Sequence, residues 1–398
     1  MTAPTPAPLL PVYAPPEQLF VRGEGPWLFT DGGEKYLDFI AGIAVNAFGH
    51  AHPALAAALK DQADKLWHLS NMFRVEGQEK LARKYVENSF ADLVFFTNSG
   101  TEAIEGALKM ARKYHTANGH PERIDIIGFQ GSFHGRSYAA INASGNPNYL
   151  EGFGPRLPGF IQVPFADHEA LKAAIGPTTA AVIIEPVQGE GGVREVPAQC
   201  LKGLREMADK HGFLIIFDEV QCGAARTGKM WAHEWAGVAP DIMAVAKGVG
   251  GGFPMGAFLA TKEAAKGMVR GVHGTTFGGN PLAMAVGNAV FDLMAAPGFL
   301  AGVEEISNHF TQALHGLKDR HGGYVLDVRG KGLLRGLRLA GDPKAAQAHA
   351  RSHKLLIGVA GDNVLRMAPP LIITPAHVST AIAALDEALT AARKDQGL

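Results

Sequence analysis

Two apolar runs in the middle of the chain each end in a charged side chain, and this pattern most constrains the fold. FLIIFDEVQ reaches Asp218, and IMAVAK reaches Lys247, which four glycines follow within five residues. Neither run alternates with polar residues, so both faces of each strand are expected to be buried, as in a parallel sheet covered by helices. The 29 residues that separate the two charges allow one crossover between neighbouring strands. The pattern therefore predicts an α/β sheet.

Asp218 and Lys247 are expected to face one crevice, because open α/β sheets bind ligands at the carboxyl ends of their strands. One interpretation is an Asp–Lys salt bridge at a domain surface. The other is a pyridoxal phosphate (PLP) site, in which the lysine bonds covalently to the cofactor aldehyde and the acid keeps the pyridine nitrogen protonated. The second interpretation requires a phosphate site and a ring-stacking aromatic elsewhere in the chain.

A candidate phosphate site lies upstream of these runs. LVFFT (93–97) has the composition of a buried strand, and the apolar stripe of a helix begins at Ala103. Between them, Ser99-Gly100-Thr101-Glu102 matches the capping-box pattern. Free backbone N–H groups and the positive end of the helix dipole would attract an anion there. An ordinary capped helix has the same pattern.

The loop GSFHGRS, which follows the strand-like run IDIIGF, contains the candidate stacking residues. Phe133 or His134 would lie near a ligand ring, and Arg136 would form a two-pronged pair with a carboxylate. Glu190 places another acid in a glycine-rich loop after AAVIIEP. A core aromatic and a solvated arginine are the alternatives.

Two later segments add candidates. Thr275 and Thr276 stand in the glycine-rich loop HGTTFGGN and would supply a second pair of phosphate donors. Arg366 lies in the strand-like segment VLRMAPPL, where a surface arginine is the alternative.

Composition excludes several classes of protein. The chain has 398 residues, a net charge of −1, 47% hydrophobic residues and 19% charged residues, so it is expected to fold and to bind neither nucleic acid nor anionic membrane. Two cysteines form no disulfide framework and fit a cytoplasmic protein. Cys222, close to Asp218, is expected to be a packed thiol. The histidines lack the spacing of a zinc motif, so no metal site is predicted. The proline-rich N-terminus lacks a basic segment and a long apolar segment, so it is not expected to be a secretory signal.

At this point the sequence resembles the class III PLP-dependent aminotransferases of fold type I. The resemblance covers nearly the whole chain from about Leu19 and rests on these stretches: FFTNSGTEAIEGALKMARKY, GFQGSFHGRS, IIEPVQGEGGV, LIIFDEVQCGAARTGKMWAHE, PDIMAVAKGVGGGFPMGA and HGTTFGGNPLA. It implies a large domain with a mostly parallel central sheet flanked by helices, and a smaller α+β domain. We expect an N-terminal arm and β-unit in residues 1–45 that packs with the small domain, the PLP-binding domain in 46–294, and the small domain in 295–398.

The resemblance also implies roles for residues around the cofactor. Lys247 would bind the aldehyde and move the proton, Asp218 would pair with the ring nitrogen, Gln221 would touch the ring hydroxyl, Phe133 would stack on the ring, and Thr101 would bind phosphate. The remaining residues of the expected cofactor site are Ser99, Gly100, His134, Glu219, Val220 and Thr276.

Substrate roles are implied in the same way. Arg136 would hold the carboxylate of the amine donor, and Arg366 that of glutamate, with Glu190 covering Arg366 between the two half-reactions. The resemblance implies a homodimer with its active site at the interface, across which Thr276 and its neighbour Thr275 reach the partner's cofactor and substrate. Tyr13, on the arm, is a candidate entrance residue.

The members that the sequence resembles most transfer an amino group from N2-acetyl-L-ornithine to 2-oxoglutarate in arginine synthesis. Related enzymes use succinylornithine, succinyl-diaminopimelate, ornithine or 4-aminobutyrate, and the sequence separates these donors poorly. A PLP aminomutase or decarboxylase is the alternative from another class, since one fold hosts several reactions.

Overall fold

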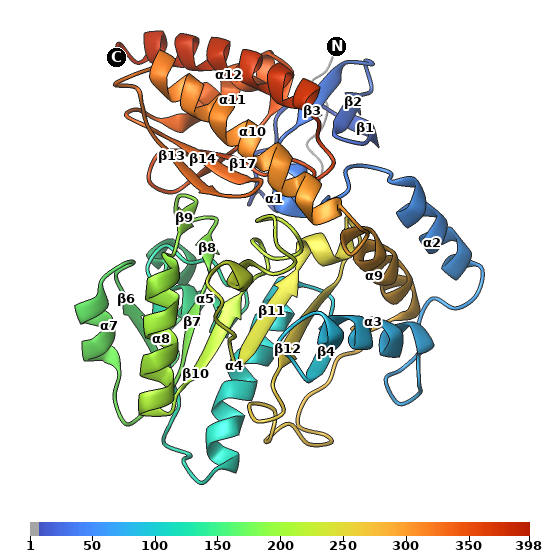
Figure 1. The fold of residues 1–398 in the computed structure, drawn as a ribbon, viewed down its shortest axis with the longest axis vertical. Helices are drawn as coiled ribbons and strands as arrows, with labels where there is room; N and C mark the ends of the chain where they lie inside the picture. Colours follow the sequence, from blue (N-terminus) through green and yellow to red (C-terminus); the bar gives the residue numbers. More distant parts are fainter. Residues whose placement is uncertain (1–7) are drawn as a thin grey trace.

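The computed structural model describes residues 8–398, and a seven-stranded sheet forms its centre (Figure 1). The strand order is β4-β12-β11-β10-β7-β5-β6. β12 is antiparallel to both neighbours, and the pairs among β11, β10, β7, β5 and β6 are parallel. The predicted mostly parallel sheet is therefore confirmed. Its strands are β4 (Leu93–Thr97), β5 (Asp125–Phe129), β6 (Phe160–Val163), β7 (Thr179–Ile184), β10 (Leu214–Asp218), β11 (Ile242–Ala246) and β12 (Gly256–Ala260).

Helices cover both faces of this sheet, because its strands are apolar on both sides. In β10, Leu214 and Ile216 pack in the cluster that contains α4, whereas Ile215 and Phe217 pack in the cluster that contains α8. The helices of this part are α2 (Pro53–Ala63), α3 (Glu76–Glu87), α4 (Gly100–Ala117), α5 (Tyr138–Ser144), α6 (Pro147–Leu150), α7 (His168–Ala174), α8 (Ala198–His211) and α9 (Pro281–Met294), and the short strands β8 (Val187–Gln188) and β9 (Arg194–Glu195) pair beside them.

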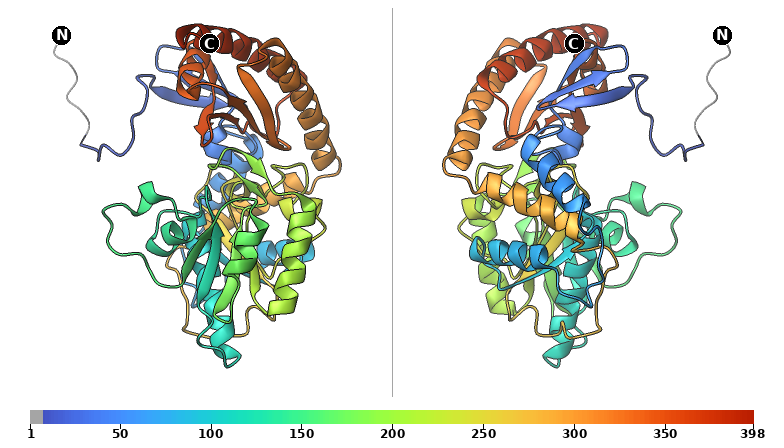
Figure 2. Two further views of the ribbon diagram at one scale, coloured as in Figure 1. Left: turned by 90° about the vertical axis from the view of Figure 1, so that its left-hand side faces the viewer. Right: turned by 90° about the vertical axis from the view of Figure 1, so that its right-hand side faces the viewer.

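The C-terminal part builds a second, antiparallel sheet with the order β13-β14-β17-β16. Figure 2 shows its long helices arching over the outer side of this sheet. The elements are α10 (Phe299–Arg320), β13 (Val325–Lys331), β14 (Leu334–Leu339), α11 (Pro343–Ser352), β16 (Gly358–Ala360), β17 (Val364–Met367) and α12 (Pro375–Asp395).

The N-terminal segment joins the C-terminal part. β1 (Phe20–Glu24), β2 (Trp27–Thr30) and β3 (Lys35–Asp38) form the predicted antiparallel unit, α1 (Ala41–Ala44) follows, and β15 (Leu355–Leu356) pairs in parallel with β3. An ion pair between Lys354 and Glu34 lies beside this pairing. The division into 1–45, 46–294 and 295–398 stays a prediction. Residues 1–7 of the arm lie outside the described residues.

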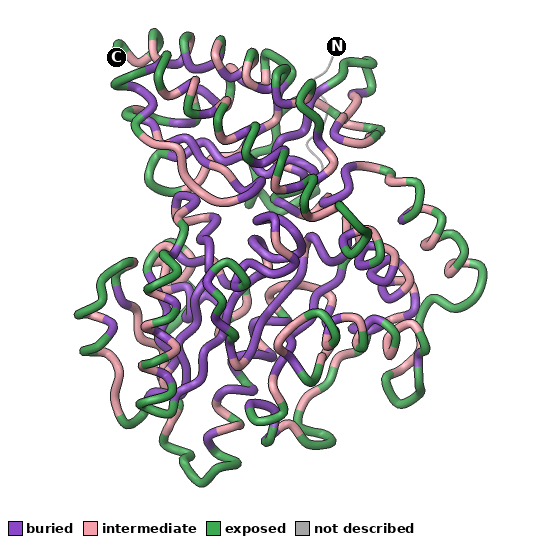
Figure 3. The backbone as a smooth tube through the Cα atoms, in the orientation of Figure 1, coloured by how far each residue is buried: buried purple, intermediate pink, exposed green. Residues whose placement is uncertain are grey.

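Buried backbone concentrates in the strands of the central sheet and in the loops at their upper ends (Figure 3). Those loops carry most of the charged residues discussed below. Within residues 8–398, no single helix has the length and apolar character needed to cross a bilayer. Helices α9 and α10, bent by 70° against each other, meet those criteria only as a pair, by length and composition.

Candidate active site

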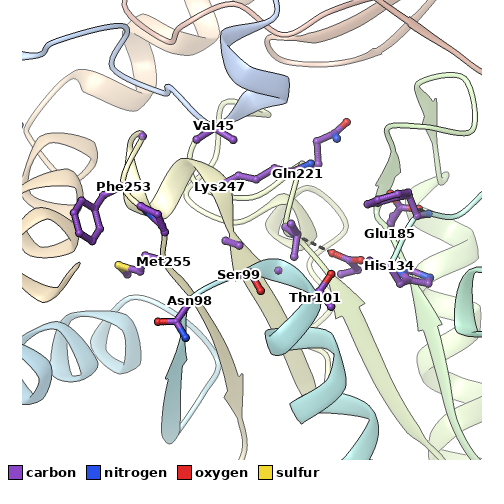
Figure 4. Close-up of a pocket in the computed structure, with 18 residues that line it drawn as sticks. Val45, Asn98, Ser99, Thr101, His134, Glu185, Gln221, Lys247, Phe253 and Met255 are labelled. Atoms are coloured by element: carbon purple, nitrogen blue, oxygen red, sulfur yellow. Dashed lines mark hydrogen bonds and ion pairs between the residues drawn. The ribbon is translucent and has the colours of Figure 1, made fainter. Parts of the chain in front are cut away.

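A cavity of about 350 Å³ lies at the carboxyl ends of the central strands, where the sequence predicts the site. Residues from β10, β11, the start of α4 and the loops after β5 and β7 meet there, and Figure 4 shows Thr101, Glu185 and Lys247 approaching it from separate elements. The lining residues are Val45, Asn98, Ser99, Gly100, Thr101, Phe133, His134, Gly135, Glu185, Asp218, Val220, Gln221, Ala246, Lys247, Gly252, Phe253, Pro254 and Met255.

Asp218, the last residue of β10, is buried in the wall of this cavity. Its Oδ2 lies 2.7 Å from Nδ1 of His134, and its Oδ1 accepts a hydrogen bond of 3.0 Å from the backbone N–H of Val220. Within the described residues no ion pair joins it to Lys247, so the salt-bridge interpretation is wrong. Partners on both oxygens fix the orientation of the carboxylate and offset the cost of burying it.

Lys247 directly follows β11 and opens a short 3-10 turn, Lys247–Gly250. Its φ of 51° lies in the left-handed region, which costs a residue with a Cβ on the order of 1 kcal/mol. Burial, together with the nearby positive charge of Arg366, lowers the pKa of the amine to about 8. The turn thus holds a readily deprotonated amine at the cavity.

The start of α4 forms one end of the cavity, and Ser99 caps it by accepting a hydrogen bond of 3.3 Å from the backbone N–H of Glu102. The carboxylate of Glu102 reaches back to the N–H of Asn98 rather than to that of Ser99. A Cβ on Gly100 would lie 2.7 Å from the side chain of Val220, so glycine allows this close approach of the helix start to Val220. Ser99, Gly100 and Thr101 all line the cavity, as the phosphate prediction requires.

Phe133 lines the cavity beside a carboxylate that the sequence analysis missed. Glu185, just after β7, accepts hydrogen bonds from the backbone N–H groups of Phe133 (3.2 Å) and Gly189 (3.4 Å). Its burial, and next the negative charge of Asp218, raise its pKa well above the ordinary value. An acid that follows a buried strand was the signal used for Asp218, and it also marks Glu185.

Arg366 and Glu190 form an ion pair next to Lys247. Arg366 lies on β17 and is 3% exposed, so the alternative of a surface arginine is wrong. Nη1 of Arg366 also lies 3.4 Å from the side-chain oxygen of Gln221. Nε of Arg366 has no hydrogen-bond partner among residues 8–398. An unpaired buried guanidinium is costly, and the ion pair with Glu190 offsets that cost.

Some predicted residues lie elsewhere. The carboxylate of Glu219 accepts hydrogen bonds from Ala232 and His233 and takes no part in lining the cavity, which corrects its assignment to the cofactor site. Thr275 and Thr276 line a separate surface depression, and Tyr13 is 86% exposed.

Cys222 is a packed thiol, as expected. It is buried, and burial raises its pKa well above the ordinary value. A thiol in this state is a poor nucleophile.

The cavity fits PLP in size and in chemistry. Its volume is that of a small-molecule site. A helix N-terminus for the phosphate, an aromatic ring at Phe133, a buried acid and a buried amine border the same space. The buried Nε2 of His134 lacks a partner within the described residues, as expected of a polar group beside a polar ligand.

Comparison with known proteins agrees with this geometry. Residues 12–389 match the family model of class III aminotransferases. The acetylornithine aminotransferase 2 of Caulobacter vibrioides is 60% identical over 97% of this chain and 96% of its own length. Among solved structures, the ornithine aminotransferase of Toxoplasma gondii, which carries PLP at partial occupancy, has a TM-score of 0.93 at 30% identity, covering 98% of this chain and 94% of its own. The N-acetylornithine aminotransferase of Stenotrophomonas maltophilia has a TM-score of 0.84 at 38% identity, covering 95% and 96%. The chain belongs to the class III aminotransferases, which use pyridoxal phosphate.

Proposed function

We propose that the protein transfers the terminal amino group of N2-acetyl-L-ornithine to 2-oxoglutarate, which gives N-acetyl-L-glutamate 5-semialdehyde and L-glutamate in arginine synthesis. The observation that carries this proposal is the buried Arg366, covered by Glu190 beside the amine of Lys247. The names of the bacterial relatives, at 53–60% identity, support the same donor.

When bound, PLP supplies an electron-accepting ring that stabilises negative charge on the carbon beside the substrate amine. Asp218 would hold the ring nitrogen, the start of α4 the phosphate and Phe133 the ring face. Lys247 would then carry the proton between the two reacting carbons, a role that suits an amine whose pKa is about 8.

The two arginines account for the use of two different substrates. The donor carries its reacting amine far from its carboxylate, whereas glutamate carries the two groups together. Arg136, on the outer loop, would hold the first carboxylate, and Arg366, inside, would hold the second. Glu190 neutralises Arg366 while the donor reacts, so the site does not attract a second carboxylate at that moment.

We further propose a cytoplasmic homodimer. Around Thr275 and Thr276, several large apolar side chains are exposed, more than an isolated monomer usually gathers in one region. The nearby ring of His68 lies 5.0 Å from that of Phe277. The exposed side chains are Trp67, Met72, Phe73 and Phe277. Sedimentation should give about twice the mass of one chain, and a single-chain mass would contradict the dimer.

Steady-state rates on five amines test the substrate. We expect the highest kcat/KM with N2-acetyl-L-ornithine, compared with succinylornithine, succinyl-diaminopimelate, ornithine and 4-aminobutyrate. The substrate assignment fails if acetylornithine is the poorest of the five. The amine donor added alone should also remove the aldehyde absorbance of the bound cofactor, whereas an aminomutase or decarboxylase would retain it.

A further inference from the structure

The guanidinium of Arg136 has aromatic neighbours in place of an acid. Arg136 is exposed, and within residues 8–398 its side chain has neither an ion pair nor a hydrogen bond; only its backbone N–H bonds, to Thr101 at 3.1 Å. Its Cζ lies 3.9 Å from the ring centre of Tyr149 and 5.4 Å from that of Phe133. The cation is therefore held by rings and keeps its hydrogen-bond donors free for an anion.

Tyr149 connects this cation to the wall of the cofactor cavity. The rings of Tyr149 and Phe133 meet edge to face, with centres 5.8 Å apart and planes at 86°. Phe133 lines the cofactor cavity. Tyr149 and Glu190 in turn line a second cavity, of about 670 Å³. Tyr149 thus lies at a junction between the ring-stacking residue, the outer arginine and open space that leads to Glu190.

The turn that presents Tyr149 is closely fixed. Tyr149 lies on α6, where the side chain of Asn146 caps the first turn by accepting from the N–H of Asn148 at 3.0 Å. Gly145 ends α5 with a φ of 64°, and a Cβ there would lie 2.2 Å from Gln162. The Gln162 amide itself donates to two carbonyls of α5. These contacts hold the backbone that carries Tyr149, and the ring itself packs against Phe133 and Arg136.

An exposed arginine without such a partner samples many rotamers, and a ligand that binds it must overcome that entropy. A ring under the guanidinium selects one rotamer before the ligand arrives. We propose that Tyr149 is a positioning residue that holds Arg136 in the orientation that accepts the carboxylate of the amine donor. It would thereby fix the distance between that carboxylate and the reacting amine. This inference rests on the proposed function, since it takes Arg136 as the carboxylate site.

A double-mutant cycle on the holoenzyme tests the inference, with N2-acetyl-L-ornithine as donor. Tyr149→Leu should raise KM roughly two- to fivefold with kcat nearly unchanged, as a cation–π contact at an exposed site predicts. Tyr149→Phe, which keeps the ring, should restore most of the wild-type KM. In the Arg136→Ala background, Tyr149→Leu should have no further effect. The cofactor absorbance should be the same in all variants, which excludes an indirect effect through Phe133.

The outcomes separate the inference from the function on which it rests. Equal losses from Tyr149→Leu in the presence and absence of the Arg136 side chain, or no loss in either background, would overturn the positioning role. If Arg136→Ala itself leaves the reaction with acetylornithine unchanged, the carboxylate role of Arg136, and with it the proposed substrate geometry, is wrong.

Discussion

The amine of Lys247 should lose its proton near pH 8 in the cofactor-free protein. Burial, and then the charge of Arg366, lower its pKa from 10.5 to about 8. This difference of 2.5 pH units corresponds to about 3 kcal/mol and to roughly 300-fold more free amine at neutral pH than an ordinary lysine has. The free amine is the form that attacks an aldehyde, so the shift would favour the bond to the cofactor that we propose for Lys247.

The same shift predicts how stability depends on pH. Between pH 8 and pH 10.5 the unfolded chain retains a proton that the folded protein has released. Stability that depends on Lys247 therefore rises with pH across this window, by up to about 3 kcal/mol, and the full destabilisation is present below pH 8. Lys247→Met removes this dependence, and it should abolish turnover and covalent binding of the cofactor while the fold is retained.

Competitive acetylation followed by mass spectrometry measures the proton directly. The peptide that contains Lys247 should show a reactivity midpoint near pH 8 in the folded cofactor-free protein and near 10.5 in the denatured chain. Arg366→Gln should move the folded midpoint upward, because it removes a positive neighbour. A folded midpoint close to 10.5 in the wild type would refute the reasoning, since burial would then have no effect on this amine.

Three further substitutions have defined outcomes. Glu190→Gln should lower KM for glutamate by up to about tenfold, because a charge-assisted hydrogen bond of about 1.5 kcal/mol no longer competes with glutamate for Arg366. A KM equal to that of the wild type would argue against the proposal that Glu190 covers Arg366. Arg226→Ala should lower the free energy of unfolding by about 2–4 kcal/mol in a denaturant titration, because two backbone carbonyls would lose the buried guanidinium that donates to them. An unchanged denaturation midpoint would contradict this prediction. Gly106→Ala should lower the free energy of unfolding by about 1–3 kcal/mol, because its Cβ would lie 2.2 Å from the buried ring of Phe258. In the matched helix variant Gly203→Ala the Cβ meets no atom within 4 Å, so this variant should raise the free energy of unfolding by up to about 1 kcal/mol. Equal effects of the two substitutions would show that the clash is not the cause.

The neighbouring strands and their charged ends could be predicted from sequence because both signals are local. The run before Asp218 and the run before Lys247 each carry apolar residues on two faces, and their spacing allows one crossover. The start of α4 was predictable for the same reason, since a capping pattern lies within four residues.

Other features depend on contacts between distant segments. The ring-held orientation of Arg136 arises because α6 brings Tyr149 to it, and no periodicity encodes that contact. Glu219 follows Asp218 directly, but in an extended segment neighbouring side chains point to opposite sides, so its carboxylate meets His233 instead of the cavity. Arg226 donates a buried hydrogen bond to the carbonyl of Pro369, a contact that no local pattern predicts.

The strand partnership between β3 and β15 has a consequence for synthesis. Glu34 and Lys354, which meet beside it, are 320 positions apart in the chain. At roughly 5–20 residues per second, a ribosome needs about 16 to 64 seconds to deliver the second after the first. Through that interval the open edge of β3 has no native neighbour and resembles an aggregation template. Pairing of β3 therefore waits for a strand that begins only 43 residues before the C-terminal Leu398, and a chain that ends before Leu355 would leave this edge of β3 unpaired.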